Sequence, residues 1–365
     1  MDLSTVTATY PQLRQKYRGF GSPTIRIYID GVDIAEKKGI LFSDVIINLS
    51  IDSASSSCSF NILGEYEFKN TAYSRNNVIN ILELGARVAV DVGYVVTENV
   101  FHGLIMEVEY AMDEGEAPHI HVECLDAKCL LMKRQITELH KDKLITDVVN
   151  DIFQEIPFNS YVRDITVEPF GEPHDMITSG NEDNYQFVIR NATEIGYEFY
   201  ILQGNVFFHP YIKGASKPPI MTLSPEYGLT SFKMCFRGSA LYNSVTVIGM
   251  DIGKNESVRE ESKIIPTVKR YASRILEGAD KIYRDYNINN SQLAKDRADA
   301  LMLSAETEFI SLSGSCVGIP ELGPGRKVHI QGISPEGDKD FYLTSVRHTL
   351  NERGFSTSWE ARMSV

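Results

Sequence analysis

The chain has 365 residues, of which 49 are acidic and 36 basic, giving a formal net charge of −13. This length exceeds what one hydrophobic core usually spans, and an acidic surface repels phosphate backbones, so we expect several domains and no nucleic-acid partner. The sequence has no run of eighteen apolar residues and its first twenty residues hold no apolar signal core. We therefore predict no membrane span and no secretory signal. The five scattered cysteines fit reduced thiols better than a disulfide framework.

Residues 1–23 are polar and end in a breaker cluster, Gly19 to Pro23, which predicts an N-terminal arm outside any core. From residue 24 onward, short runs alternate apolar with polar residues. These runs are Ile25–Ile29, Val45–Ile51, Cys58–Ile62, Val88–Val92, Leu104–Val108 and Ile120–Cys124. Because alternation buries one face of a strand and leaves the other free, residues 24–128 are predicted to form a first antiparallel β-barrel domain.

The pattern then changes to helical spacing. Apolar residues recur at helical intervals from Leu144 to Ile156, and Pro157 ends the run. A second helix is predicted over residues 184–195, with Gly196 as its left-handed C-cap. The following segments pair as a hairpin around Gln203–Asn205, so residues 129–231 are predicted to form a small α+β domain.

Strands return after residue 232. Residues 232–250 and 305–365 are predicted to form a second β-barrel domain, interrupted by a polar and helical insertion at 251–304. Within the insertion, Asp251 to Lys263 is predicted to be a loop, and Ser291 is predicted to be the N-cap of a helix. The fold class is therefore mostly β with α+β insertions, in which two related antiparallel β-barrel domains flank a small α+β domain.

Two histidine motifs invite a chemical interpretation. His119-Ile120-His121 places two imidazoles on one face of a strand, but a zinc site needs three or four ligands, and we favour solvated strand histidines. His174-Asp175 could be half of a catalytic dyad, yet no Gly-x-Ser-x-Gly elbow accompanies it. A surface position in a loop rich in glycine and proline is the simpler interpretation.

The remaining candidates are acidic pairs and one glycine-rich loop. Glu107/Glu109 and Glu306/Glu308 have spacings that solvated strand or helix surfaces commonly produce. The loop Gly323–Lys327 fails the spacing of a phosphate loop and precedes a strand instead of a helix. We predict no catalytic residue, no cofactor and no metal, and hence a protein that is not an enzyme.

A resemblance emerges from the order of several weak motifs. They are Phe101-His102-Gly103-Leu104-Ile105, Phe187 with Gly196, Tyr242-Asn243-Ser244-Val245-Thr246-Val247, Gly318 to Gly325, Val328-His329-Ile330, Phe341 to Thr349 and Gly354 to Thr357. In this order and spacing, over about residues 20–365, the chain resembles the late control protein D family of tailed phages. That family is similar to the central hub of contractile-tail baseplates and to the hub part of type VI secretion valine-glycine repeat spike proteins.

The resemblance implies a structural subunit made in the bacterial cytoplasm and built into the baseplate of a phage tail or tail-like particle. It implies a homotrimer whose β-barrels form a pseudo-sixfold ring between the sixfold inner tube, or a tube-initiator protein, and a threefold spike. Other baseplate proteins are further implied partners. Because the sequence ends at Val365, directly after the last barrel strand, we expect the spike on a separate chain.

We expect the contacts on exposed faces of strands at residues 24–30, 87–93, 241–249 and 327–349, with residues 251–290 as a docking arm. Two alternatives remain open: a tail-associated glycan-binding module, which surface tyrosines favour, and a peptidoglycan hydrolase.

Overall fold

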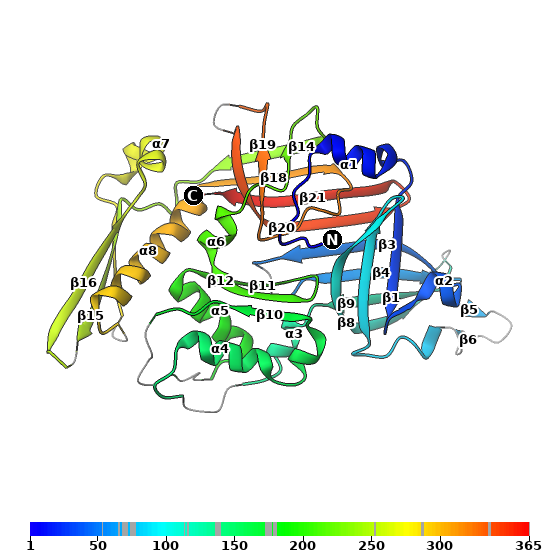
Figure 1. The fold of residues 1–365 in the computed structure, drawn as a ribbon, viewed down its shortest axis with the longest axis horizontal. Helices are drawn as coiled ribbons and strands as arrows, with labels where there is room; N and C mark the ends of the chain where they lie inside the picture. Colours follow the sequence, from blue (N-terminus) through cyan, green and yellow to red (C-terminus); the bar gives the residue numbers. More distant parts are fainter. Residues whose placement is uncertain are drawn as a thin grey trace.

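The structure is a computed structural model of the whole chain (Figure 1). It describes residues 1–52, 54–64, 66–67, 72–73, 78–112, 114, 117–135, 140–171, 177, 181–251, 253–285, 288–334 and 337–364. The motif His174-Asp175, predicted to lie at the surface of a loop, falls outside the described residues. None of the helices in the described part is long and apolar enough to cross a membrane.

The alternating runs form strands as predicted, and these make up the first β unit. Its elements are β1 (Thr24–Ile29), β2 (Val32–Asp33), α2 (Ile34–Lys38), β3 (Leu41–Ser50), β4 (Ser57–Leu63), β7 (Arg87–Gly93), β8 (Thr97–Ala111) and β9 (His119–Leu125). A separate short pair, β5 (Tyr66–Glu67) and β6 (Ala72–Tyr73), lies beyond β4. In β9, every second side chain is buried, which is the period-two pattern of the sequence.

The second β unit is built from the C-terminal part of the chain. Its strands are β13 (Thr222–Leu223), β14 (Leu229–Phe236), β18 (Ile310–Val317), β19 (Lys327–Ile330), β20 (Lys339–Asn351) and β21 (Gly354–Met363). The mostly-β fold class is thus confirmed.

The two β units share one strand order, although β1 pairs antiparallel with β7 whereas β13 pairs parallel with β19. The first runs β3-β4-β9-β8-β7-β1 across the sheet, and the second runs β14-β18-β21-β20-β19-β13. If the six main strands of each unit are numbered along the chain, their order across the sheet is 2-3-6-5-4-1 in both units. The units are also joined, because β20 pairs antiparallel with β3 from Ser345↔Ser50 to Leu350↔Val45. We call this pairing the seam; it merges both units into one 13-stranded sheet.

The α+β region lies against both units (Figure 1). It comprises α3 (Lys128–Leu131), α4 (Ile145–Gln154), η3 (Phe158–Tyr161), β10 (Asp164–Val167), α5 (Asn184–Ile195), β11 (Tyr197–Leu202), β12 (Asn205–Pro210) and α6 (Tyr211–Ser216). Asp183 caps α5, and Gly196 ends it with φ +70°, as predicted. The predicted hairpin forms between β11 and β12, where Gln203 and Gly204 both have positive φ. A core of its own unites α4, α5 and these strands.

Residues 244–307 form a projecting layer of three strands and two helices (Figure 1). Its elements are β15 (Ser244–Asp251), β16 (Glu256–Lys263), α7 (Pro266–Leu276), β17 (Asp280–Arg284) and α8 (Ser291–Thr307). The prediction of a loop over 251–263 is wrong. β16 pairs with β15 along its whole length, so the polar residues there lie on the solvent-exposed face of a sheet. Asn290, not Ser291, is the N-cap of α8 and accepts from the Leu293 amide. The predicted strand at 241–249 exists, but it belongs to this layer and not to the main sheet.

The N-terminal segment is less of an arm than its composition predicts. It forms α1 (Tyr10–Lys16) and a 3-10 turn, η1 (Arg18–Phe20), and buries Leu3, Leu13 and Tyr17 in the main core. The expectation that it lies outside any core is therefore wrong. Its apolar residues are too sparse to form a periodic signal, yet these three pack into the main core.

Candidate functional site

The predicted chemical candidates serve structural roles where the structure describes them. His119 and His121 lie on β9, and the Nδ1 atom of His121 is 2.8 Å from the amide oxygen of Asn61. Within the described ranges, no three His, Cys, Asp or Glu side chains gather as metal ligands. The two histidines therefore belong to the polar face of the sheet.

The two acidic pairs lie in different environments. Glu107 and Glu109 are exposed on β8. Glu306 is buried on α8, and its carboxylate accepts from the Ile265 amide at 2.5 Å. Burial raises the pKa of Glu306, which this hydrogen bond opposes. Neither pair faces a shared site, so neither can act as an acid and base couple.

The loop at residues 323–327 ties the N-terminal segment down. Arg326 is 1 % exposed, and its guanidinium donates to the carbonyls of Leu3, Val6 and Pro218 at 2.8–3.3 Å. Gly325 has φ +76°, and a Cβ there would meet the Tyr200 hydroxyl at 2.5 Å. The loop thus holds backbone carbonyls instead of a phosphate. Sequence reasoning missed Arg326, because a lone arginine after glycines carries no signal of burial.

A second tie joins α1 to both β units. The Nζ atom of Lys16 lies 2.6 Å from the carboxylate of Glu98 on β8 and 2.9 Å from that of Glu321 in the second unit. The Tyr17 hydroxyl donates to the same Glu321 oxygen at 2.8 Å. Since Glu321 is 1 % exposed, this cluster is a partly buried staple and not a ligand site.

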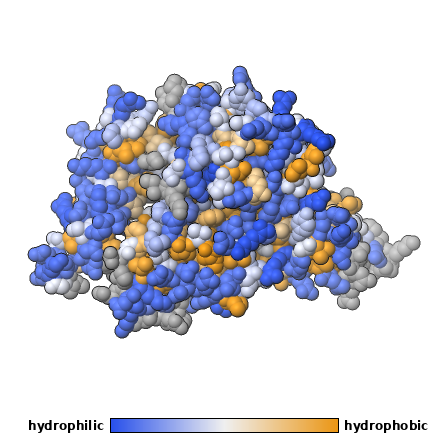
Figure 2. Space-filling model, in the orientation of Figure 1, coloured by the Kyte–Doolittle hydropathy of each residue, from blue (hydrophilic) through white to orange (hydrophobic). Residues whose placement is uncertain are grey.

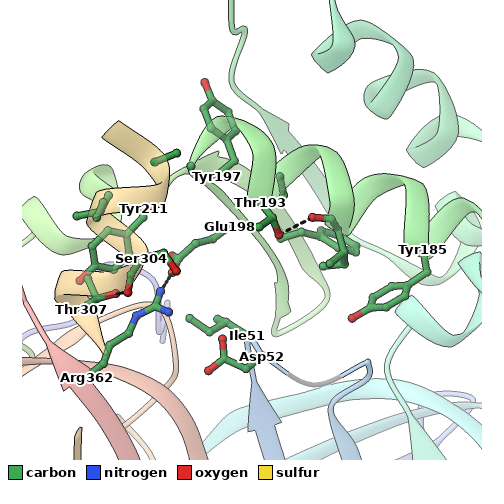
Figure 3. A pocket seen from close by; sticks show the side chains of 16 residues that line it. Ile51, Asp52, Tyr185, Thr193, Tyr197, Glu198, Tyr211, Ser304, Thr307 and Arg362 are labelled. Carbon is green, nitrogen blue, oxygen red and sulfur yellow. Dashed lines mark hydrogen bonds and ion pairs between the residues drawn. The ribbon is translucent and has the colours of Figure 1, made fainter. Parts of the chain in front are cut away.

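A cavity of about 260 Å³ opens where α5, β11, α8 and the end of β21 meet (Figure 3). Glu198 lies at its base, where Arg362 donates to one carboxylate oxygen at 2.5 Å and the Tyr342 hydroxyl donates to the other. Burial raises the pKa of Glu198 to about 7, against the effects of Arg362 and Tyr342. Because both carboxylate oxygens of Glu198 already accept hydrogen bonds, we interpret the cavity as part of the contact between the α+β region and the second β unit.

The outward face of the central sheet is lined by short polar side chains. They include Ser231, Ser313, Ser315, Ser358, Ser345, Ser50, Asn48, Ser57 and Ser59, on six adjacent strands. A shallow groove runs over part of this face, with Trp359 beneath it. Such a surface offers many weak hydrogen bonds, and its groove also carries charged side chains of both signs, Lys233, Arg347 and Glu360.

In the described part of the chain, the open strand edges of the main sheet include those of β14 and β8, besides the end strands β2 and β13. β14 pairs with β18 on one side only, and β8 pairs with β9 but loses β7 beyond Leu104. Large apolar side chains are exposed on these strands: Phe232 and Phe236 are each 45 % exposed on β14, Tyr110 is 47 % exposed on β8 and Met112, directly after it, is 58 % exposed. Figure 2 shows how apolar residues reach an otherwise hydrophilic surface as separate patches.

The strands predicted to make contacts differ in whether they have an exposed face. β1, β7 and β20 have an outward face with exposed residues, as predicted. On β15, however, residues 244–247 are all buried: Val245 packs in the main core, Val247 on the same face packs against α8, and the alternate residues Ser244 and Thr246 are also buried. The exposed face expected over 241–249 is therefore absent from residues 244–247, and the contact itself stays a prediction. The edge strand β14 was missed because its alternation is weak and its edge is invisible in the sequence.

A family model described as the Alg8 N-terminal domain matches residues 21–352. The chain belongs to this family. A comparison with curated proteins finds no match. Among solved structures, the fold of this family member is similar to several tail proteins.

The 43 kDa tail protein of prophage MuSo2 from Shewanella oneidensis has 15 % identity and a TM-score of 0.68, over 93 % of this chain and 98 % of that one. The tail protein from Neisseria meningitidis MC58 has 15 % identity and a TM-score of 0.68, over 94 % and 97 %. An E. coli component of the type VI secretion system, described as structurally similar to the T4 tail proteins gp27 and gp5, has 13 % identity and a TM-score of 0.56, over 92 % and 76 %. The predicted resemblance to hub proteins of contractile injection systems is therefore confirmed in the fold.

Proposed function

We propose that this chain is a structural hub subunit in the baseplate of a contractile tail or injection system, and that it acts without catalysis. Three copies form a pseudo-sixfold ring, which joins the sixfold inner tube to a threefold spike carried by a separate chain. The observation that supports this best is the repeated topology of the two β units. Two alike units per subunit, taken three times, give the six similar positions that a sixfold tube requires.

The polar outward face of the sheet and the exposed faces of several strands fit this role. Hub interfaces that hold an assembly together are expected to bury on the order of 2,000–5,000 Å², which needs broad surfaces and not a deep pocket. A threefold ring uses two different patches on each subunit, because the same patch cannot pair with itself around a threefold axis.

The native mass of the purified full chain, alone and with the candidate spike, tests the proposal. A trimer that binds three spike chains is expected. A chain that stays monomeric at high concentration and ignores the spike overturns the proposal. Clearing of peptidoglycan in a zymogram overturns its non-enzymatic part.

A further inference from the structure

The open edges of β14 and β8 have the same places in the fold as the two strands of the seam. In the repeated topology, β14 is the counterpart of β3 and β8 is the counterpart of β20. Inside the chain, β20 pairs with β19 through its first half and with β3 through its second half. β8 pairs with β7 through its first half, and the same edge of its second half is open in the described structure. Each open edge thus lacks the neighbour that its counterpart has.

We infer that β14 of one copy pairs antiparallel with residues 107–112 of the next copy, so that the seam is repeated between subunits. This inference rests on the proposed trimer and specifies its contact. The two edges differ, so the association is head to tail, which is the kind of contact that closes a ring.

Irregularities in the strands give the register. β8 has one unmatched residue, Met106, between the pairs Ile105↔Cys124 and Glu107↔Glu123. β20 has one at the same place, Thr344, between Leu343↔Ala361 and Ser345↔Glu360. Bulges of this kind are built features of a strand, so they mark equivalent positions. Glu107 is therefore the counterpart of Ser345, and Glu123 the counterpart of Glu360.

The other side of the contact follows from the strand pairs. Glu123 pairs with Ser59, which pairs with Ile46. Glu360 pairs with Ser313, which pairs with Lys233. Lys233 on β14 is thus the counterpart of Ile46 on β3. Transferring the seam register gives the intermolecular pairs Glu107–Arg237, Val108–Phe236, Glu109–Cys235, Tyr110–Met234, Ala111–Lys233 and Met112–Phe232.

The register was derived from backbone pairing alone, and the side chains that it brings together are also complementary. Three of its pairs are apolar on both sides, and they cover the four exposed residues Phe232, Phe236, Tyr110 and Met112. At the seam, the residues in the places of the first two are Val45 and Leu49, which are 1 % and 2 % exposed. The first pair sets a carboxylate opposite a guanidinium. Cross-strand pairs of both kinds stabilise antiparallel sheets.

Charge also selects a second copy of this chain over an unrelated strand. Lys233 and Arg237 make the β14 edge basic, whereas Glu107 and Glu109 make the β8 edge acidic. Among the described residues, the competing contact on the open edge at 107–112 is at its end, where the Tyr73 hydroxyl donates to the Ala111 carbonyl at 3.2 Å. The ring of Tyr73 also lies with its centroid 5.0 Å from that of Tyr110, tilted by 58°, so it lies beside the proposed contact as part of its rim.

A single substitution tests the register, because Cys235 is a native thiol that is not buried. In Glu109→Cys, the new thiol would face Cys235 of the neighbouring copy at the separation that a disulfide needs, with Cα atoms less than about 7 Å apart. The other four cysteines are buried. Mild oxidation of the full chain should give covalent dimers and trimers on a non-reducing gel, and reduction should remove them. The double variant Glu109→Cys/Cys235→Ser should give none.

Glu107→Cys is the register control, because it displaces the new thiol by two residues on the same face of the same strand. A trimer by native mass that does not cross-link in Glu109→Cys overturns the strand pairing and leaves the proposed trimer intact. Stronger cross-linking in Glu107→Cys overturns the register. A chain that is monomeric under all conditions overturns the pairing together with the trimer.

Discussion

The seam and the two open edges are the same piece of architecture in two situations. At the seam, β3 and β20 meet within one chain, and the side chains between them are buried. At the open edges, β14 beyond β18 and residues 107–112 on the side of β8 away from β9 have no strand partner in the described chain, and large apolar side chains are about half exposed. Fold alone therefore does not decide which residues are core and which are interface. In the proposed assembly, the same position is core where the neighbouring unit belongs to the same chain and interface where the neighbour comes from another copy.

The two β units also differ in how they contact the α+β region. Leu125, at the end of β9, packs against its apolar core. The counterpart of Leu125 on β21 is Arg362, which reaches Glu198 of the same region through an ion pair. One unit is attached by apolar packing and the other by a buried charge pair.

The largest expected effect breaks that charge pair. Arg362→Leu places the residue type of the first unit into the second and leaves Glu198 buried without its cation. Removing one partner of a buried pair costs about 3–5 kcal/mol in the free energy of unfolding, which urea titration of the full chain measures. Adding Glu198→Met should recover most of the loss. No recovery in the double variant would mean that Arg362 contributes by its packing and not by its charge.

The next effect compares the seam with the open edge at one equivalent position. Leu49→Ala opens a cavity in the seam and should cost about 2–5 kcal/mol of unfolding free energy. Its counterpart Phe236→Ala should cost about 1 kcal/mol in the monomer, because Phe236 is 45 % exposed and its ring contacts Phe309 and Tyr271. The same Phe236→Ala should weaken self-association, measured by sedimentation over a dilution series. Equal losses of monomer stability in the two variants would contradict the equivalence.

A third effect is the acid sensitivity of the seam. His348 on β20 is 1 % exposed and hydrogen-bonds Thr357, and burial lowers the pKa of His348 to about 4. Its ordinary pKa is about 6.5, so neutral His348 contributes its full stability above that pH and loses it as the pH falls toward 4. The difference corresponds to about 3 kcal/mol.

His348→Gln should therefore flatten the fall in unfolding free energy between pH 6.5 and 4. His102 provides the matched comparison: it lies on β8, away from the seam, and burial lowers its pKa to about 4 as well, so His102→Gln should flatten the same fall. If the flattening occurs only in His102→Gln, the acid-sensitive group is not at the seam.

Sequence reasoning found those parts of the fold whose signals are local. The alternating strands, the helix over 184–195 with Gly196 and the hairpin at Gln203 all depend on neighbouring residues. The strand β16 was missed because its polar residues, from Glu256 to Lys263, conceal a period-two pattern that only its pairing with β15 reveals. The buried Arg326 and the open edge of β14 depend on partners hundreds of residues away or on another chain. The contact strands were therefore predictable as a class, whereas the decisive edge was not.

The smallest expected effect is electrostatic and tests the edges alone. Glu107→Arg sets two cations opposite each other in the inferred register, and Arg237→Glu sets two carboxylates opposite each other. Since one cross-strand charge pair contributes roughly 0.2–1 kcal/mol, each single reversal should weaken self-association by up to about tenfold, more at low salt than at high salt. Both side chains are exposed in the monomer, so the urea midpoint of the dilute chain should not move. The double reversal should restore association, because it recreates the pair with its signs exchanged. Additive losses in the double variant would show that Glu107 and Arg237 act on different partners, and would place the contact between copies elsewhere on the ring.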